Sequence, residues 1–297
     1  MEPDEPEAVF AHPDVTRLLD LAVSEDLGRE GDVTSRVIPA GERCTAHVIY
    51  REGGVVCGLP LAERVLTRIC PEASLSRRAV EGTRLEPHSV AAVIQGPARG
   101  VLAAERTLLN FLQRLSGVAT LTRRFVDAIQ GTRAHVLDTR KTTPGWRRLE
   151  KYAVRVGGGQ NHRFGLYDQV LLKDNHLAAL GGEQNVATAV QAARSAAPPG
   201  TPLEVEVTTV AGALAAARAA ADIVLLDNFS PAGLREAVLA VRQDAERRGA
   251  RAPALEASGG ITLETVRAVA ETGVDRISTG AVTHSARALD IALDFVA

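Results

Sequence analysis

Hydrophobic residues recur along this chain in two different rhythms, and the rhythm changes near residue 130. The first part mixes short strands and helices without long crossovers, which is typical of an α+β layer. Its expected elements are a helix over 13–27, a hairpin over 43–58 that turns at Gly53-Gly54, a helix over 61–70, strands over 75–80 and 89–95, and a helix over 100–129 with a break near Ser116-Gly117.

From Arg133 onward strand, loop and helix alternate, which predicts right-handed βα units and a parallel sheet. Six strands are expected, fewer than the eight of a closed barrel, so the pattern favours an open or irregular α/β barrel. The expected strands are 134–139, 169–174, 203–208, 223–229, 255–258 and 276–279, and the expected helices are 183–197, 210–220, 231–248 and 262–272.

These rhythms divide the chain into three parts. Residues 1–12 form an acidic leader that we expect to be disordered at its beginning. Residues 13–117 form an α/β N-terminal domain, and residues 118–297 form an incomplete α/β barrel. We expect a C-terminal helix to pack back on the N-terminal domain.

Composition excludes several classes of protein. Hydrophobic residues make up 45% of the chain and aromatic residues only 3%, so the core must consist of Ala, Val, Leu and Ile. The net charge of −2 and the scarce aromatics do not favour nucleic-acid binding. We expect no membrane span and no signal peptide. Cys44, Cys57 and Cys70 form no CxxC pair, and we expect buried, reduced thiols in a cytoplasmic protein.

Positive charge is concentrated in residues 133–173, where nine Lys and Arg face three Asp and Glu. In an acidic chain such a stretch indicates an anion site. Within it, Gly157-Gly158-Gly159 predicts a tight loop whose backbone approaches another segment closely. For four further cations a solvated face is favoured over a role in the anion site; they are Arg147, Arg148, Lys151 and Arg155.

The carboxyl ends of the expected strands carry most of the candidate chemistry, and ligands of α/β proteins bind at such ends. Two late Gly-rich loops resemble phosphate-binding turns. Glu206 and Asp227 lie on successive strands and could hold Mg²⁺ or ribose hydroxyls, stabilise an oxocarbenium-like carbon, or form a structural ion pair. Glu204 shares a strand face with Glu206, and for it an ion pair is favoured. The strand-end residues are Thr139-Arg140-Lys141, Lys173, Glu206, Asp227, Ser258-Gly259-Gly260 and Thr279-Gly280-Ala281.

Several cations could bind one small ligand with two or more negative charges. They are Arg140, Lys141, His162, Arg163 and Lys173, although a structural role is an alternative for His162.

The chain closely resembles the quinolinate phosphoribosyltransferase family. The matching stretches are EDLGREGDVTS (25–35), ERTLLNFLQRLSGVAT (105–120), TRKTTPG (139–145), GGGQNHRFGL (157–166), KDNH (173–176), EVEV (204–207), LLDNF (225–229), EASGGIT (256–262) and STGAVTHS (278–285). The resemblance implies an α/β N-terminal domain, an incomplete α/β barrel and a homodimer in which one subunit completes the other's site. It also implies conversion of quinolinate and phosphoribosyl pyrophosphate, with Mg²⁺ and no organic cofactor, to nicotinate mononucleotide, pyrophosphate and carbon dioxide in NAD synthesis.

By the same resemblance, Arg106 would reach the quinolinate of the neighbouring subunit. Arg140, His162, Arg163 and Lys173 would line the quinolinate pocket, and Thr139 and Lys141 would border both substrates. Glu206 and Asp227 would serve the ribose and the metal-bound pyrophosphate. Of these residues, Lys141, Glu206 and Asp227 are our candidates for catalysis. The 5-phosphate would bind the loops Ser258-Gly259-Gly260 and Thr279-Gly280-Ala281.

Three alternatives stay open. One is a related phosphoribosyltransferase for another pyridine base, which would release no carbon dioxide from nicotinate. Another is a sugar-phosphate lyase in which Lys173 forms a Schiff base. The third is a catalytically silent phosphate-ligand sensor, which would not need Glu206 and Asp227.

Overall fold

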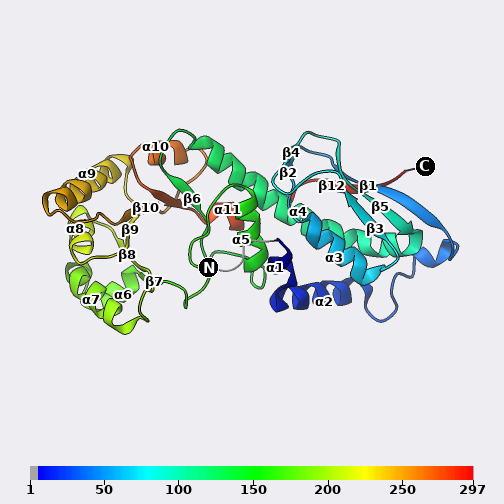
Figure 1. Cartoon of the computed structure of the whole chain (residues 1–297), viewed down its shortest axis with the longest axis horizontal. Helices are drawn as coiled ribbons and strands as arrows, with labels where there is room; N and C mark the ends of the chain where they lie inside the picture. Colours follow the sequence, from blue (N-terminus) through cyan, green and yellow to red (C-terminus); the bar gives the residue numbers. More distant parts are fainter. Residues whose placement is uncertain (1–5, 297) are drawn as a thin grey trace. The chain divides into compact units, whose positions relative to one another are not determined.

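A computed structural model describes residues 6–296, which divide into two compact units (Figure 1). The first unit contains the chain up to Arg123, the segment Thr142–Gly158 and the residues from Val282 onward. The second contains Arg124–Lys141 and Gly159–Ala281. The expected boundary at residue 117 therefore misses two later segments that join the first unit.

The start of the described chain is helical. Helix α1 spans Pro6–Ala11 and buries Phe10 completely, so the second half of the acidic leader is helical; the disorder expected at its beginning falls on residues 1–5, which lie outside the described part. An apolar Val-Phe pair gives this short helix a buried contact that its acidic composition does not reveal. Helix α2 spans Pro13–Leu27 and ends at Gly28, as the sequence predicts.

The first unit contains an antiparallel sheet in the order β12-β1-β5-β3. Strand β1 (Arg43–Tyr50) pairs with β5 (Ser89–Pro97) on one side and with β12 (Ile291–Val296) on the other. Strand β3 (Ser74–Arg77) pairs with β5.

The hairpin expected over residues 43–58 is wrong. Strand β2 (Gly54–Val55) pairs with β4 (Arg84–Leu85) in a separate two-stranded sheet. Both edges of β1 are already paired with β5 and β12, so β1 offers no free edge to the residues that follow it.

The expected C-terminal helix is a strand. Strand β12 does return to the first unit, where it pairs antiparallel with β1. Ile291 and Leu293 are buried while Asp294 is exposed, and this alternation fits a strand that covers a core with one face.

Helix α3 spans Leu59–Ile69, and helix α4 runs unbroken over Ala98–Ala128, so the break expected at Ser116-Gly117 is wrong. A Cβ atom on Gly117 would lie 1.9 Å from the carbonyl oxygen of Arg287. Glycine at this position therefore allows close approach of the chain near Arg287; it does not end the helix.

Helix α5 (Arg147–Val156) belongs to the first unit and was not expected. Its Glu150 is fully buried and accepts from Arg114 Nη2 at 2.6 Å. Lys151 has only 2% of its surface exposed, so the expected solvated face is wrong for Lys151. The tight loop predicted after this helix is confirmed, since a Cβ atom on Gly157 would lie 2.6 Å from the carbonyl oxygen of Ala119.

The second unit contains one parallel six-stranded sheet in the order β6-β11-β10-β9-β8-β7. Strands β6 and β7 are successive along the chain but occupy the two edges, so the sheet stays open and the predicted incomplete barrel is confirmed. The strands are β6 (His135–Leu137), β7 (Val170–Leu172), β8 (Leu203–Val207), β9 (Ile223–Asp227), β10 (Ala254–Ser258) and β11 (Arg276–Ser278).

Helices connect these strands as the alternation predicts (Figure 1). They are α6 (Asp174–Ala179), α7 (Val186–Ala196), α8 (Val210–Arg218), α9 (Pro231–Arg247) and α10 (Val266–Ala270), and the short α11 (Ala281–His284) follows β11. A 3₁₀ turn spans Glu183–Asn185 in this unit, and another spans Ser35–Val37 in the first unit.

Aliphatic residues dominate both cores, as the composition predicts. Cys57 and Cys70 are buried free thiols, and Cys44 is a partly exposed one. Over residues 6–296, every helix is too short or too polar to cross a bilayer.

Candidate active site

The candidate residues of the second unit lie at one edge of its parallel sheet, where the strands end. Asp227 and Ser258 are the last residues of β9 and β10 and are paired in register. Glu206 stands one residue before the end of β8, and Lys173 directly follows β7. The carboxyl ends of parallel strands meet at the same edge, so the structure brings these side chains together. Arg106 lies in the first unit, exposed on α4.

Lys173 and Glu206 form an ion pair between neighbouring strands. The Lys173 Nζ atom lies 3.1 Å from Glu206 Oε2, with 44% of the lysine side chain and 11% of the glutamate side chain exposed. A half-exposed pair of this kind adds little to stability. It leaves Lys173 accessible to a second anion.

The Asp227 carboxylate is oriented by the residue that follows it. Asn228 donates its side-chain amide to Asp227 Oδ2 at 2.7 Å and its backbone N–H to the Ser258 carbonyl at 2.9 Å. Asn228 holds a φ of 56°, which is uncommon outside glycine. The end of β9 is thus fixed to the Ser258-Gly259-Gly260 loop, whose two glycines are exposed.

The second Gly-containing loop is tied to the first. Thr279 donates its backbone N–H to the Leu137 carbonyl at 3.0 Å and its hydroxyl to the Ile261 carbonyl at 3.1 Å. The same hydroxyl accepts the Ala281 N–H at 3.2 Å. These bonds link the loops after β6, β10 and β11, where the sequence predicts phosphate binding.

Two arginines of the second unit raise the local positive potential. Burial and the charge of Arg140 lower the pKa of the Arg163 guanidinium, while Glu204 and Asp168 oppose this effect. Arg163 is 7% exposed and donates from Nη1 to the Gln169 carbonyl at 3.3 Å. Mutually repelling guanidiniums favour a bound anion between them. Lys141 is exposed beside them, and its N–H is held by the Thr139 hydroxyl at 3.0 Å.

His162 lies deeper than the other candidates. Its Nε2 atom is 3.0 Å from Glu204 Oε2 and 3.4 Å from Glu256 Oε1, and only 5% of its side chain is exposed. Burial tends to lower the pKa of His162, but the adjacent carboxylates of Glu204 and Glu256 raise it to about 9. Glu204 is thus an ion-pair residue.

Sequence reasoning missed Asp138, Glu256 and Arg276. Asp138 and Glu256 are fully buried, and Glu256 pairs with Arg276 at 2.7 Å. A signal existed for the last two, since each stands two residues before the end of its strand and so shares the face of the strand-end residue.

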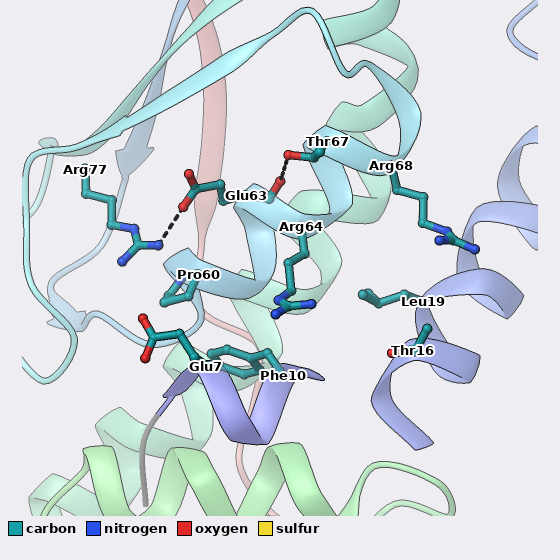
Figure 2. A pocket seen from close by; sticks show the side chains of 10 residues that line it. All are labelled: Glu7, Phe10, Thr16, Leu19, Pro60, Glu63, Arg64, Thr67, Arg68 and Arg77. Atoms are coloured by element: carbon teal, nitrogen blue, oxygen red, sulfur yellow. Dashed lines mark hydrogen bonds and ion pairs between the residues drawn. The ribbon is translucent and has the colours of Figure 1, made fainter. Parts of the chain in front are cut away.

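A separate pocket of about 540 Å³ lies in the first unit, between α1, α2 and α3 (Figure 2). Its cations are partly neutralised: Arg77 binds Glu63 at 2.5 Å, and Arg68 binds Asp20. None of the strand-end residues lines it, so this pocket is no part of the candidate site.

Comparison with known proteins gives the family. The model of the quinolinate phosphoribosyl transferase N-terminal domain matches residues 32–116, and the model of the C-terminal domain matches residues 118–294. The chain belongs to the quinolinate phosphoribosyl transferase family. The family inferred from the sequence motifs is therefore confirmed.

Curated relatives agree along nearly the whole chain. A nicotinate-nucleotide pyrophosphorylase [carboxylating] of Mycobacterium leprae is 45% identical over 278 residues, covering 92% of this chain and 94% of that protein. A probable nicotinate-nucleotide pyrophosphorylase [carboxylating] of Bacillus subtilis is 40% identical, covering 95% and 94%.

Solved structures confirm the fold class. The nicotinate-nucleotide pyrophosphorylase from Francisella tularensis superposes with a TM-score of 0.89 at 38% identity, covering 97% of this chain and 99% of that one. Human nicotinic acid phosphoribosyltransferase, at 14% identity and a TM-score of 0.65, covers 93% of this chain and 74% of that one, and shares the fold alone.

Proposed function

We propose that the protein transfers the phosphoribosyl group of phosphoribosyl pyrophosphate to quinolinate and decarboxylates the product, a step of NAD synthesis. The match of both family domains in order, with a carboxylating pyrophosphorylase at 45% identity, carries the proposal. The edge of the parallel sheet supports it, because cations, two acids and two Gly-containing loops converge there.

In this proposal, cations hold the two carboxylates of quinolinate. Arg140, Arg163 and Lys173 supply charge-assisted hydrogen bonds. His162 directly precedes Arg163 and lies deeper in the unit, against Glu204. Thr139 and Lys141 border both substrates. Fixing the ring in this way places its nitrogen in line with the anomeric carbon of the ribose.

The sugar would lie over the carboxyl ends of the central strands β8, β9 and β10. Glu206 and Asp227 face the ribose, and the 5-phosphate would lie against the loops Ser258-Gly259-Gly260 and Thr279-Gly280-Ala281, where the exposed Gly259 and Gly260 let it approach the backbone closely. As the carbon–oxygen bond to pyrophosphate breaks, positive charge grows at the anomeric carbon, and the two carboxylates stabilise it.

The chemistry then proceeds in two bond exchanges. The lone pair of the pyridine nitrogen forms the new carbon–nitrogen bond while pyrophosphate leaves with the electrons of the broken bond. As carbon dioxide departs, the electron pair of the ring-to-carboxylate bond stays on the ring carbon, where the adjacent positive nitrogen stabilises it until that carbon is protonated. A proton from solvent completes the ring. Neither a covalent enzyme intermediate nor an organic cofactor is required.

Magnesium is part of the proposal as a companion of phosphoribosyl pyrophosphate. Carboxylate oxygens are ligands that Mg²⁺ prefers, and Glu206 and Asp227 provide them at the same sheet edge. Both acids are partly exposed, so they fit a hydrated ion held directly or through the pyrophosphate. When bound, the ion would neutralise charge on the leaving pyrophosphate.

The deciding assay measures carbon dioxide. Purified protein with phosphoribosyl pyrophosphate, Mg²⁺ and quinolinate labelled in the carboxylate beside the nitrogen should yield nicotinate mononucleotide and labelled carbon dioxide in about equal amounts, because one carboxylate leaves per transfer. Turnover of nicotinate without gas release would favour the transferase for another base. Borohydride trapping of a sugar-phosphate adduct on Lys173 would favour the lyase.

The proposed enzyme is a cytoplasmic homodimer whose sites are completed by Arg106 of the neighbouring subunit. Arg106 is exposed on α4, and buried free thiols such as Cys57 suit a reducing compartment. No nucleic acid or membrane partner is proposed.

Mixing two impaired variants tests the shared site. We expect Arg106→Ala and Lys173→Ala each to lose at least about nine-tenths of wild-type turnover alone but to recover about a quarter of it after co-refolding in equal amounts. Half of the dimers are then mixed, and each has one intact site. Absence of recovery, with mixed dimers verified by mass, would contradict the shared site.

A further inference from the structure

Three buried acids of the second unit have no part in the proposed reaction. Asp138 follows β6, Glu204 lies on β8 and Glu256 lies on β10, and each has a relative exposed area of 0%. A buried carboxylate is destabilising unless it is paired or hydrogen-bonded. All three acids meet at one residue, His162.

Two of the acids hold the His162 ring. Glu204 Oε2 lies 3.0 Å from Nε2 and also accepts from Gln169 Nε2 at 2.5 Å. Glu256 Oε1 lies 3.4 Å from the same nitrogen, and its Oε2 lies 2.7 Å from Arg276 Nε. The ring thus contacts acids of β8 and β10, which stand before the last residues of these strands.

The third acid holds the backbone of the same loop. Asp138 Oδ1 accepts the His162 N–H at 2.8 Å, and Oδ2 accepts the Asn161 side-chain amide at 2.7 Å. The loop before β7 is therefore fixed at its main chain by the end of β6 and at its side chain by β8 and β10.

The orientation of the ring does not depend on its charge. Nδ1 accepts the Arg163 N–H at 2.7 Å, which requires a neutral ring with its hydrogen on Nε2. The two carboxylates instead favour the imidazolium and raise the pKa of His162 to about 9, although burial opposes them. Both forms carry a hydrogen on Nε2 that faces Glu204 and Glu256, so the carboxylates orient the ring in either state.

We propose that Glu204 and Glu256 are positioning residues that hold His162 and, through it, place Arg163 for the carboxylates of the pyridine substrate. This inference rests on the proposed function. Arg163 is the next residue along the loop, and its guanidinium is nearly buried beside the charge of Arg140. Repulsion between the two guanidiniums would move an unanchored loop, and a displacement of about 1 Å can cost about a hundredfold in rate. The phosphoribosyl side of the site, on Glu206, Asp227 and the two Gly-containing loops, would keep its geometry.

The test is a comparison of Michaelis constants in Glu204→Gln and Glu256→Gln. Each change keeps the size of the side chain but removes the charge that faces the ring. We expect the KM for quinolinate to rise about 10- to 100-fold, the KM for phosphoribosyl pyrophosphate to change less than about twofold, and kcat to fall less than the quinolinate KM rises. Glu256→Gln leaves Arg276 without its charged partner, so if it does not fold, the double variant Glu256→Gln/Arg276→Gln is measured in its place.

Asp244→Asn is the matched control. Asp244 is a buried acid on α9 that pairs with Arg218 at 2.8 Å and with Arg248 at 2.8 Å, away from the strand ends. It should lower thermal stability and leave both Michaelis constants unchanged.

An unchanged quinolinate KM in the Glu204 and Glu256 variants, or an equal rise of both constants, would overturn the positioning role. Failure of the wild-type protein to make nicotinate mononucleotide in the same assay would instead overturn the proposed function, so the two failures are distinct.

Discussion

Asp227→Asn and Glu206→Gln are each expected to lower kcat for phosphoribosyl transfer about a hundredfold. Both changes remove a negative charge that would face the anomeric carbon as pyrophosphate leaves. The side chains keep their shape, and both are partly exposed, so the fold should persist. Quench-flow or steady-state measurement of nicotinate mononucleotide formation gives kcat, and circular dichroism verifies folding.

A carboxylate elsewhere in the second unit provides the comparison. Glu236 is exposed on the outer helix α9, and Glu236→Gln makes the same chemical change away from the strand ends. Its turnover should equal that of the wild type. If Asp227→Asn and Glu206→Gln behave like Glu236→Gln, the two acids do not serve the reacting carbon.

Lys173→Ala is expected to lower kcat/KM for quinolinate at least tenfold while the fold stays intact. A charge-assisted hydrogen bond contributes about 1.5–3 kcal/mol, and about 1.4 kcal/mol corresponds to a factor of ten. The pair with Glu206 is half-exposed on the lysine side, so its loss should change stability by less than about 1 kcal/mol. Arg140→Ala should behave in the same way.

Arg194→Ala is the control for this loss of a cation. Arg194 pairs with Asp222 at 2.8 Å and is 42% exposed, close to the value for Lys173, but Asp222 precedes β9 at the amino end of the sheet. Removing it should leave turnover unchanged. Near-normal quinolinate turnover in purified Lys173→Ala would remove Lys173 from the binding site.

The sequence predicts the second unit well because its folding information is local. Each βα unit carries its own apolar strand and amphipathic helix, so six strands could be counted and a parallel sheet with right-handed crossovers could be predicted. The strand-end positions of Glu206, Asp227 and Lys173 follow from the same pattern, since parallel strands end at one edge.

The first unit is harder to predict because its partners are distant along the chain. Strand β12 and helix α5 join it from later positions along the chain. The local sequence of β12 does not indicate β1 as its partner, and that of α5 does not indicate Arg114. Gly117 reads as a helix break in the sequence, whereas it permits contact with a segment that follows much later.

Burial of charge is also hidden from the sequence. In the sequence, Glu256 and Asp138 cannot be distinguished from surface acids. Their burial and their contacts with His162 depend on the folded sheet and on the loop that carries His162. Only the alternation of side chains along a strand signalled Glu204 and, in principle, Glu256.

The pairing of β1 with β12 also affects when this protein can fold during synthesis. Positions 43–50 leave the ribosome long before positions 291–296, and until then one edge of β1 has unpaired N–H and C=O groups. All strands of the parallel sheet, in contrast, lie between these two strands along the chain. Co-translational folding of the first unit should therefore finish last, and the nascent chain should depend on chaperones that cover an exposed strand edge.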